Sequence, residues 1–333
     1  MPIVSNAKLE EAFSLAIEDR SRGYADLVSN SNVVLAVMKE KGGWKTFSGP
    51  TIRERLLYAE SGSYVRYSGY EFLNPVPAEL FNDAEFTAKL AAVSVTLSGE
   101  DILKNSGPNQ LMDIMEEHIA AGERELTDRF VEDLHSNGTA DGGRQIGGLQ
   151  VAVPTVNNSG VYGGIDRATV PLWQTGSYTA TGLAGGVISA TNIHDIYTQV
   201  LINHTRGTKG PNLIAASSGH YRFFQAALVA IQRVAKEGKT ARLGFPSLAF
   251  AGAGYELDVV LEGGIGSAMP SNTSYFLKVG DDGLRFRYHP DRNFVAFGGK
   301  QRPVNQDAVV QHIGFYGNVT LANPLFQAKL LGT

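Results

Sequence analysis

The sequence has no cysteine among its 333 residues, and this absence excludes several chemistries at once. A disulfide framework, a thiolate metal site and a cysteine nucleophile all require a thiol. Charged side chains are also scarce: they make up 19% of the chain, against roughly 25% in typical soluble domains. The 29 basic and 33 acidic residues give a net charge of −4, so no global basic excess points to nucleic acid or to anionic lipid.

Long apolar runs are missing as well. The longest candidate, residues 33–38, is far shorter than the ~18 to 20 residues of a membrane-spanning helix. The N-terminus becomes charged at Lys8, Glu10 and Glu11 and lacks the basic start and apolar stretch of a secretory signal. We therefore expect a soluble protein that is made in a cytoplasm and does not contact a membrane.

What the chain does contain is enough material for a large core. Apolar residues make up 43%, and there are 16 Phe, 13 Tyr and 2 Trp, so the length fits one large domain or two that share a core. The 38 glycines and 13 prolines indicate many turns. A large chain with few charges and many turns often covers its surface with copies of itself.

The strongest helical pattern spans residues 109–137. Apolar residues recur there at steps of four and seven, which predicts a helix about 43 Å long. Its acidic residues outnumber its basic ones by six, so the remainder of the chain is slightly basic. A solvated acidic face explains this charge better than a carboxylate metal site, because the Glu-x-x-His spacing of such a site is absent.

Two strands are expected before this helix, at 44–60 and 63–73, joined by a turn at 60–63 and followed by a strand at 87–97. Further strands and helices are expected along the rest of the chain. The helices are 193–204 and 219–235, and the strand-like runs are 149–153, 213–216, 255–261, 274–279, 284–288, 309–321 and 325–330. The mixture predicts an α+β protein.

Signatures of catalysis and of cofactor binding are absent. The Gly-x-Gly runs at 252–254 and 264–266 do not complete a dinucleotide fingerprint, and there is no phosphate-binding loop, nucleophile elbow or His-Glu-x-x-His. The seven histidines do not stand at ligand spacing. We therefore expect no enzyme activity, no cofactor and no metal. Two alternatives stay open: a single-strand nucleic-acid platform at Tyr64–Tyr67, and a β-rich hydrolase with distant paired carboxylates.

Several stretches occur together in an order that one known family shows. They are Ile146-Gly147-Gly148-Leu149, the run Tyr-Gly-Gly-Ile-Asp-Arg-Ala-Thr at 162–169, Val-Asn-Gln-Asp at 304–307 and Gly-Phe-Tyr-Gly-Asn-Val-Thr at 314–320. With the hairpin and the acidic helix, they resemble the major capsid proteins of tailed double-stranded-DNA bacteriophages, whose fold encapsulin nanocompartments share. The resemblance covers essentially the whole chain.

The resemblance implies four structural parts. They are an N-terminal arm at 1–40, an extended β-hairpin loop at 41–76, a peripheral domain at 77–190 and 304–333 with the spine helix 109–137, and an axial domain at 191–303. The hairpin loop is expected to reach over a neighbouring subunit. Its seven aromatic residues, one fifth of residues 41–75, would be an aggregation hazard if they stayed exposed.

Candidate functional residues follow from this interpretation. The candidate inter-subunit residues are Trp44, Arg53, Arg55, Tyr64, Arg66, Tyr70, Phe72, Asp166 and Arg167. The acidic helix is expected to face the lumen of the shell through Glu116, Glu117 and Glu123. There it would repel packaged phosphates rather than bind them.

The implied function is structural: self-assembly, as hexamers and pentamers, into an icosahedral head that encloses a double-stranded DNA genome without sequence-specific binding. The expected location is the virion, assembled in the host cytoplasm. Because Met1 directly precedes the arm, we expect a separate scaffolding protein rather than a built-in one, together with a portal and a decoration protein. The alternative within this fold is an encapsulin-like compartment around protein cargo.

Overall fold

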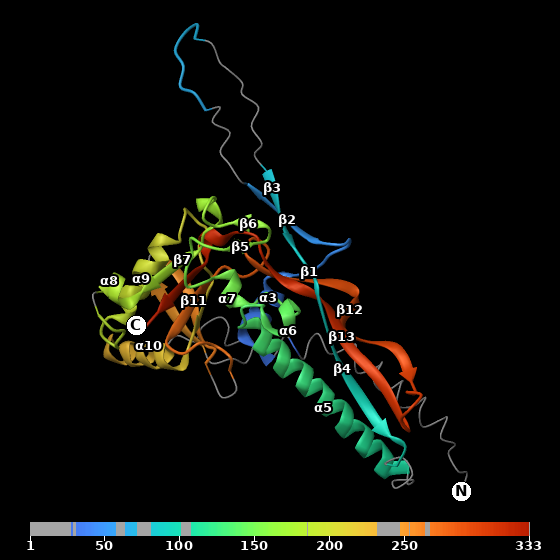
Figure 1. The fold of residues 1–333 in the computed structure, drawn as a ribbon. Helices are drawn as coiled ribbons and strands as arrows, with labels where there is room; N and C mark the ends of the chain where they lie inside the picture. The colour runs from blue at the N-terminus through green and yellow to red at the C-terminus, as the bar shows by residue number, and fades with distance from the viewer. Residues whose placement is uncertain are drawn as a thin grey trace.

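The computed structural model describes residues 28, 31–57, 64–71, 81–100, 108–184, 186–231, 247–252, 254–263 and 267–332. Two sheets with their helices form the body, and a two-stranded hairpin projects from it (Figure 1). The α+β class predicted from the sequence is confirmed. Among the described residues, no helix is long and apolar enough to cross a membrane.

The four-stranded sheet has the order β1-β12-β13-β4. Its strands are β1 (Trp44–Thr46), β12 (Leu284–Gln301), β13 (Ala308–Leu321) and β4 (Lys89–Ser98), and all neighbours are antiparallel except β1 and β12. The long helix α5 (Pro108–Leu134) packs against one face of this sheet. A Cβ at Gly122 of α5 would lie only 2.8 Å from a methyl group of Val95, so glycine permits the close approach there.

Aromatic side chains fill the space between α5 and the sheet. The ring of Phe130 lies 5.0 to 5.3 Å from the rings of three phenylalanines and meets each edge-on. They are Phe286, Phe294 and Phe315. The helix α3 (Val33–Glu40) completes this core: it is capped by Asn32, and its first six residues are buried. Residues 31–40, which the sequence assigned to the arm, therefore pack into the body; residues 1–27, 29 and 30 lie outside the described part.

The six-stranded sheet has the order β7-β14-β11-β8-β10-β9. Its strands are β7 (Gly176–Thr179), β14 (Ala328–Leu331), β11 (Thr273–Leu277), β8 (Leu213–Ala216), β10 (Tyr255–Leu261) and β9 (Ser247–Gly252). The helices on it are α8 (Ala180–Ala184), α9 (Ile193–Asn203) and α10 (Ser218–Ile231). A second apolar core lies here, with the buried ring of Tyr197 against Phe224, Phe250 and Phe276.

Short elements connect these layers. They are α6 (Ala140–Gly143), α7 (Leu149–Ala152), β5 (Val161–Tyr162), β6 (Ile165–Asp166), η1 (Pro171–Trp173) and η3 (Pro324–Phe326). The hairpin consists of β2 (Ile52–Leu57) and β3 (Phe81–Phe86), antiparallel from Ile52 opposite Phe86 to Leu57 opposite Phe81.

Most predicted elements are confirmed, and three are wrong. The spine helix, the strand after the hairpin and the helices starting near 193 and 219 agree within a few residues. Residues 149–153 form the helical turn α7 instead of a strand, packed so closely under the end of α5 that Gly148 has no room for a Cβ. The run 325–330 begins as the 3₁₀ turn η3, because Pro324 starts it, and becomes a strand only at Ala328.

The hairpin is the third correction. The segment 44–60 is divided: β1 joins the body sheet beside β12, and only β2 enters the hairpin. The partner of β2 is β3 at 81–86, and the described residues 64–71 form the tip beyond them (Figure 1). The predicted domain limits also cut through both sheets, because β12 lies within 191–303 whereas β7 and β14 lie outside it. The partner of β2 and the make-up of the two sheets are decided by pairing between strands that are distant in sequence, which sequence periodicity does not encode.

Candidate functional site

The base of the projecting hairpin is anchored by alternation along β2. Ile52, Glu54 and Leu56 point into the protein and are buried, whereas Arg53 and Arg55 between them are exposed. On the partner strand, Ala84 and Phe86 are buried on the same side and join the body core. One face of the hairpin base therefore packs on the body, and the other carries charge into solvent.

Glu54 is a buried carboxylate, 3% exposed, that receives several donors from the body sheet. Arg285 donates to it at 2.6 Å, Arg287 at 2.7 and 3.2 Å, and the hydroxyl of Thr320 at 3.0 Å. A buried carboxylate needs such paired donors, since an isolated buried charge is strongly unfavourable. This cluster bonds β2 to β12 and β13, and so holds the hairpin to the body.

The two exposed arginines of β2 are neutralised within their own hairpin. Arg53 lies 2.9 Å from Glu85, and Arg55 lies 3.8 Å from Asp83. Both pairs are cross-strand neighbours in the register. Arg53 and Arg55, the predicted inter-subunit residues of β2, are exposed, and each already has an acidic partner in the same subunit.

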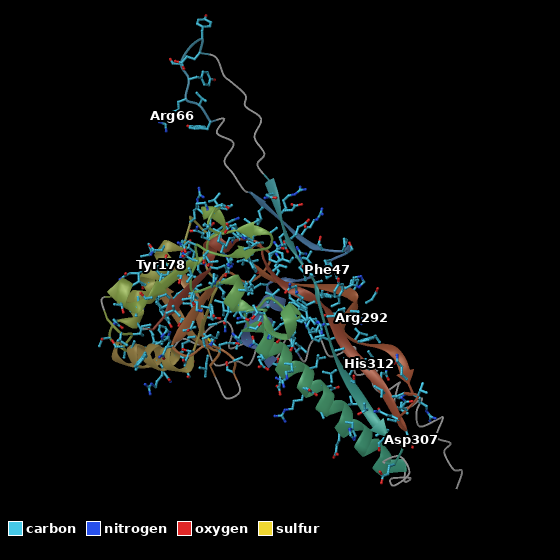
Figure 2. The ribbon with its side chains drawn as sticks, viewed as in Figure 1. Phe47, Arg66, Tyr178, Arg292, Asp307 and His312 are labelled. Atoms are coloured by element: carbon cyan, nitrogen blue, oxygen red, sulfur yellow. The ribbon has the colours of Figure 1, made fainter. Side chains whose placement is uncertain are left out.

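Trp44 belongs to the body rather than to the projecting part. Its ring packs in tilted arrangements against Phe286, Tyr288 and Phe294, with ring centroids 5.0 to 6.3 Å apart. Phe47 likewise lies beside Tyr316 at the edge of the body, far from the tip that carries Arg66 (Figure 2). The expectation of exposed hairpin aromatics is therefore wrong for these two rings, because the parallel pairing of β1 with β12 draws them into the sheet.

The tip of the hairpin, residues 64–71, matches the prediction of an exposed aromatic surface. All eight residues are exposed, including Tyr64, Tyr67 and Tyr70, and Arg66 stands among them (Figure 2). A run of large exposed side chains on a projection is typical of a surface that is covered by a partner. Phe72, the other predicted contact residue of this segment, lies outside the described residues.

The Gly-Gly-Ile-Asp-Arg motif supports the hairpin base. Gly163 has a φ of +60° and approaches Phe86 so closely that a Cβ would lie 2.8 Å from its ring, and its carbonyl accepts from the Glu85 amide at 2.9 Å. The ring of Tyr162 lies edge-on to Phe86 at 5.0 Å. The motif therefore requires glycine at this position for its backbone and for its packing.

Arg167 stabilises the same region from within. It is 3% exposed, its guanidinium lies 4.8 Å from the ring of Tyr162, and it donates to the carbonyls of Val151 and Ala152. Burial lowers the pKa of this arginine. The half-buried Asp166 accepts from the Ala168 amide at 2.9 Å. Arg167, predicted to lie between subunits, is thus buried in its own subunit, because the backbone carbonyls of α7 need its donors.

The spine helix presents an acidic surface on one side only. Glu117 is exposed, as are Glu125, Asp128 and Glu132. Glu123 is 9% exposed, since it lies on the side of the helix that also carries Ile119, Leu126 and Phe130. Of the three predicted lumen-facing residues, Glu117 fits an open acidic face, Glu123 does not, and the side chain of Glu116 lies outside the described part.

Sequence reasoning missed a buried polar cluster at the end of this helix. His135 follows α5 directly, and its Nε2 lies 3.0 Å from the carboxylate of Glu262 in the loop after β10. Asn32, the residue that caps α3, donates to the same carboxylate. All three side chains are buried. The residues are more than 100 positions apart and share no motif, so no sequence signal links them.

No group of three or more metal-ligating side chains occurs in the described part of the chain. His220 and Tyr197 both bond to Ser274 at 2.8 Å, but the three side chains are fully buried in the second core, where a substrate has no access. The surfaces around the hairpin are therefore the candidate functional site.

Comparisons with known proteins agree on the fold. No family model matches this sequence, and no curated protein matches it. A subunit of the cyanophage A-1(L) capsid asymmetric unit is similar in structure: TM-score 0.62, 16% identity, covering 86% of this chain and 89% of that chain. A chain from the capsid of an empty GTA particle has a TM-score of 0.54 at 12% identity, over 89% of this chain and 96% of that chain.

A cellular shell protein is similar as well. The SrpI encapsulin of Synechococcus elongatus PCC 7942 has a TM-score of 0.50 at 12% identity, covering 89% of this chain and 87% of that chain. At such low identities the likeness is one of fold. The chain has the fold shared by phage capsid and encapsulin shell proteins, which is the fold that the sequence resemblance implied.

Proposed function

We propose that this chain is a major capsid protein, which assembles with copies of itself into the icosahedral head of a tailed bacteriophage. The observation that carries the proposal is the capsid fold, matched over 86% of the chain by a cyanophage capsid subunit. The projecting tip with its exposed tyrosines supports it, because such a surface needs a partner that the isolated subunit lacks.

The role is structural rather than catalytic. The similar chains come from a phage capsid, a GTA particle capsid and an encapsulin complex, and all of these are shells. Subunits would occupy hexamers and pentamers of a head that is assembled in the host cytoplasm. A separate scaffolding protein, a portal and a decoration protein are proposed partners. The open acidic side of α5 would face the lumen, where packaged DNA lies without sequence-specific contacts.

An encapsulin-like compartment that encloses a protein cargo is the second candidate. The likeness to the SrpI encapsulin favours it, although the TM-score of 0.50 is lower than the 0.62 for the cyanophage capsid. The two candidates differ in what the shell encloses, whereas the subunit fold is common to both.

Electron microscopy of the purified protein tests the shell function. We expect uniform icosahedral particles when the chain is expressed with its neighbouring genes. Nuclease-protected double-stranded DNA in the particles supports the phage head, and a co-purifying enzyme supports the encapsulin. A monodisperse monomer under every assembly condition would contradict both.

A further inference from the structure

Lys329 of β14 is a buried cation whose contacts in the described part of the chain are neutral. The residue is 5% exposed, and burial lowers the pKa of its amine, with no carboxylate acting on it. Its Nζ donates to the hydroxyl of Thr155 at 3.0 Å and lies 5.4 Å from the centre of the Tyr275 ring. A buried ammonium group is unfavourable unless an opposite charge compensates it. The surroundings of Lys329 therefore favour an anion beside it.

Hydroxyl groups share the sheet face of this lysine. In the register, Lys329 stands opposite Ser177 of β7 on one side and Tyr275 of β11 on the other, so the three side chains form one row. Thr175 stands two residues before Ser177, and the alternation of the strand places it on the same face. The hydroxyls of Tyr275 and Thr175 are buried and have no hydrogen-bond partner among the described residues. Such hydroxyls are donors from which an anion accepts.

A second buried cation raises the positive potential of the same region. Arg167 is 3% exposed and donates to two backbone carbonyls of α7, while Lys329 bonds to Thr155 a few residues further along this segment. Burial lowers the pKa of Arg167, and the ionisable group that acts on it is the phenol of Tyr162 rather than an acid. Two cations thus approach residues 151–155, and no carboxylate of the described residues compensates either of them.

We propose that Lys329 and Tyr275 bind a small anion, a carboxylate or a phosphate group, between the sheet and the segment 154–157. The segment is tied down beside them, because Ser177 donates to the carbonyl of Thr155 and Asn157 donates to that of Thr175. Thr155 is exposed, so the ammonium lies just beneath the surface, where a small anion can enter. A water molecule would pair with the hydroxyls but would leave the charge uncompensated, so an anion fits the site better.

Two sources supply this chemistry. One is a free anion of the solution, and the other is an acidic side chain of a neighbouring copy in an assembly. The inference goes beyond the proposed shell function, since the isolated subunit already contains both binding residues. The binding test therefore needs no shell, and shells serve to distinguish the two sources.

Isothermal titration calorimetry of the free subunit, with sodium phosphate and separately with sodium acetate, tests the site. Ionic strength is kept constant with sodium HEPES, whose anion is too large for the site. We expect saturable binding of one anion per subunit for at least one of the two salts. The melting temperature should rise with the logarithm of its concentration, as linkage requires of a ligand that binds only the folded chain.

Three variants locate the binding. Lys329→Met keeps the aliphatic stem and should abolish binding. Tyr275→Phe keeps the ring and should weaken binding severalfold, while the melting temperature without anion stays equal or rises, because a buried unpaired hydroxyl is removed. The matched control is Lys209→Met at an exposed lysine, which should bind like the wild type. If Lys329→Met does not fold, Tyr275→Phe decides alone.

No saturable binding in the free wild-type subunit would overturn the inference, and so would equal binding by the wild type and Tyr275→Phe. In wild-type shells, binding that persists identifies a free anion as the occupant. Binding that is lost on assembly, together with a lower dissociation midpoint in Lys329→Met shells than in Lys209→Met shells, identifies a carboxylate of a neighbouring copy. Absence of wild-type shells would overturn the proposed function and leave the result on the free subunit standing.

Discussion

At the scale of single residues, Glu54 is a buried carboxylate whose donors come from two other strands. It accepts from two arginines and one threonine while almost fully buried. Replacing it by glutamine removes the negative charge between the two guanidiniums, each less than one fifth exposed, and leaves Arg285 with only the exposed Asp281 at 3.7 Å as an acidic partner. Breaking a buried ion pair in this way costs about 3 kcal/mol.

We therefore expect Glu54→Gln to lower the free energy of unfolding by about 3 kcal/mol, measured by urea denaturation. Hydrogen exchange should also increase in residues 52–57 and 81–86, because the cluster holds the hairpin base. Glu85→Gln is the matched control: it breaks the exposed pair with Arg53 and should cost under about 1 kcal/mol. Equal losses for the two variants would show that burial of Glu54 is not what matters.

His220 makes the stability of the subunit depend on pH. Burial lowers the pKa of its imidazole to about 4. Its Nδ1 lies 2.8 Å from the hydroxyl of Ser274, which also bonds to the hydroxyl of Tyr197 at 2.8 Å, and its buried Nε2 has no hydrogen-bond partner among the described residues. Between pH 6.5 and about 4 the unfolded chain binds this proton and the folded one does not, so stability falls as the pH falls.

The expected loss is at most about 1.4 kcal/mol for each pH unit across that window. His204 adds to it with the same sign, since burial lowers its pKa too. In His220→Gln, the decline of unfolding free energy between pH 6.5 and 4.5 should be shallower, whatever the stability at pH 7. An unchanged slope in the variant would mean that His220 does not contribute.

At the scale of elements, periodicity within one segment predicted where a helix or strand lies. It did not predict which distant strands pair with each other. The spine helix was predicted because its apolar residues repeat over seven turns, a local signal. The hairpin was misplaced because the alternation at 64–72 imitates a strand, whereas the true partner of β2 is 81–86, in which only Ala84 and Phe86 are known to be buried.

The candidate site was predicted in part for the same reason. Exposure of Tyr64, Arg66 and Tyr70 followed from their position on a projection. The Glu54 cluster joins residues more than 230 positions apart. Arg167 is buried where it donates to backbone carbonyls of α7, a helical turn that was predicted as a strand. Neither contact could be read from one segment.

The spine helix allows a test of the proposed lumen. Its open side carries Glu117, Glu125, Asp128 and Glu132, with Arg124 and Arg129 paired to two of them. Neutralising three acids, in Glu117→Gln with Glu125→Gln and Asp128→Asn, should increase retention of duplex DNA by empty shells at low salt. The control is the equal change Asp195→Asn with Asp282→Asn and Asp291→Asn on other exposed elements. If both triple variants retain the same DNA, the acidic side of α5 does not face the lumen.

The hairpin tip should be dispensable for folding and necessary for assembly. Residues 64–71 contribute no side chain to either core, since all are exposed. Replacing them with a Gly-Ser linker of equal length should therefore leave the circular dichroism and the melting temperature of the subunit nearly unchanged. Closed shells should be absent from electron micrographs of the same sample. Intact, heat-stable particles from the linker variant would show that the tip is not an assembly element.

At the scale of the whole molecule, the composition and the structure point to the same source of assembly energy. Only 19% of residues are charged, and the arginines of the hairpin base already have partners in their own subunit. Three exposed tyrosines at the tip present ~150–250 Å² each, and burying half of that contributes roughly 6–9 kcal/mol before the entropy of association is subtracted. Exposed ion pairs contribute under about 1 kcal/mol each.

Apolar burial should therefore outweigh charge in holding the shell together. We expect Tyr64→Ala with Tyr70→Ala to lower the denaturant concentration at which shells dissociate, and Arg53→Ala with Arg55→Ala to change it little. Raising the salt from 0.1 to 0.5 M shortens the Debye length from its ~10 Å at the lower concentration, so a shell held by surface charges would loosen. Light scattering across that range should instead show constant particle size for the wild type. Dissociation at high salt, or a larger effect of the arginine pair than of the tyrosine pair, would assign the subunit contacts to charge.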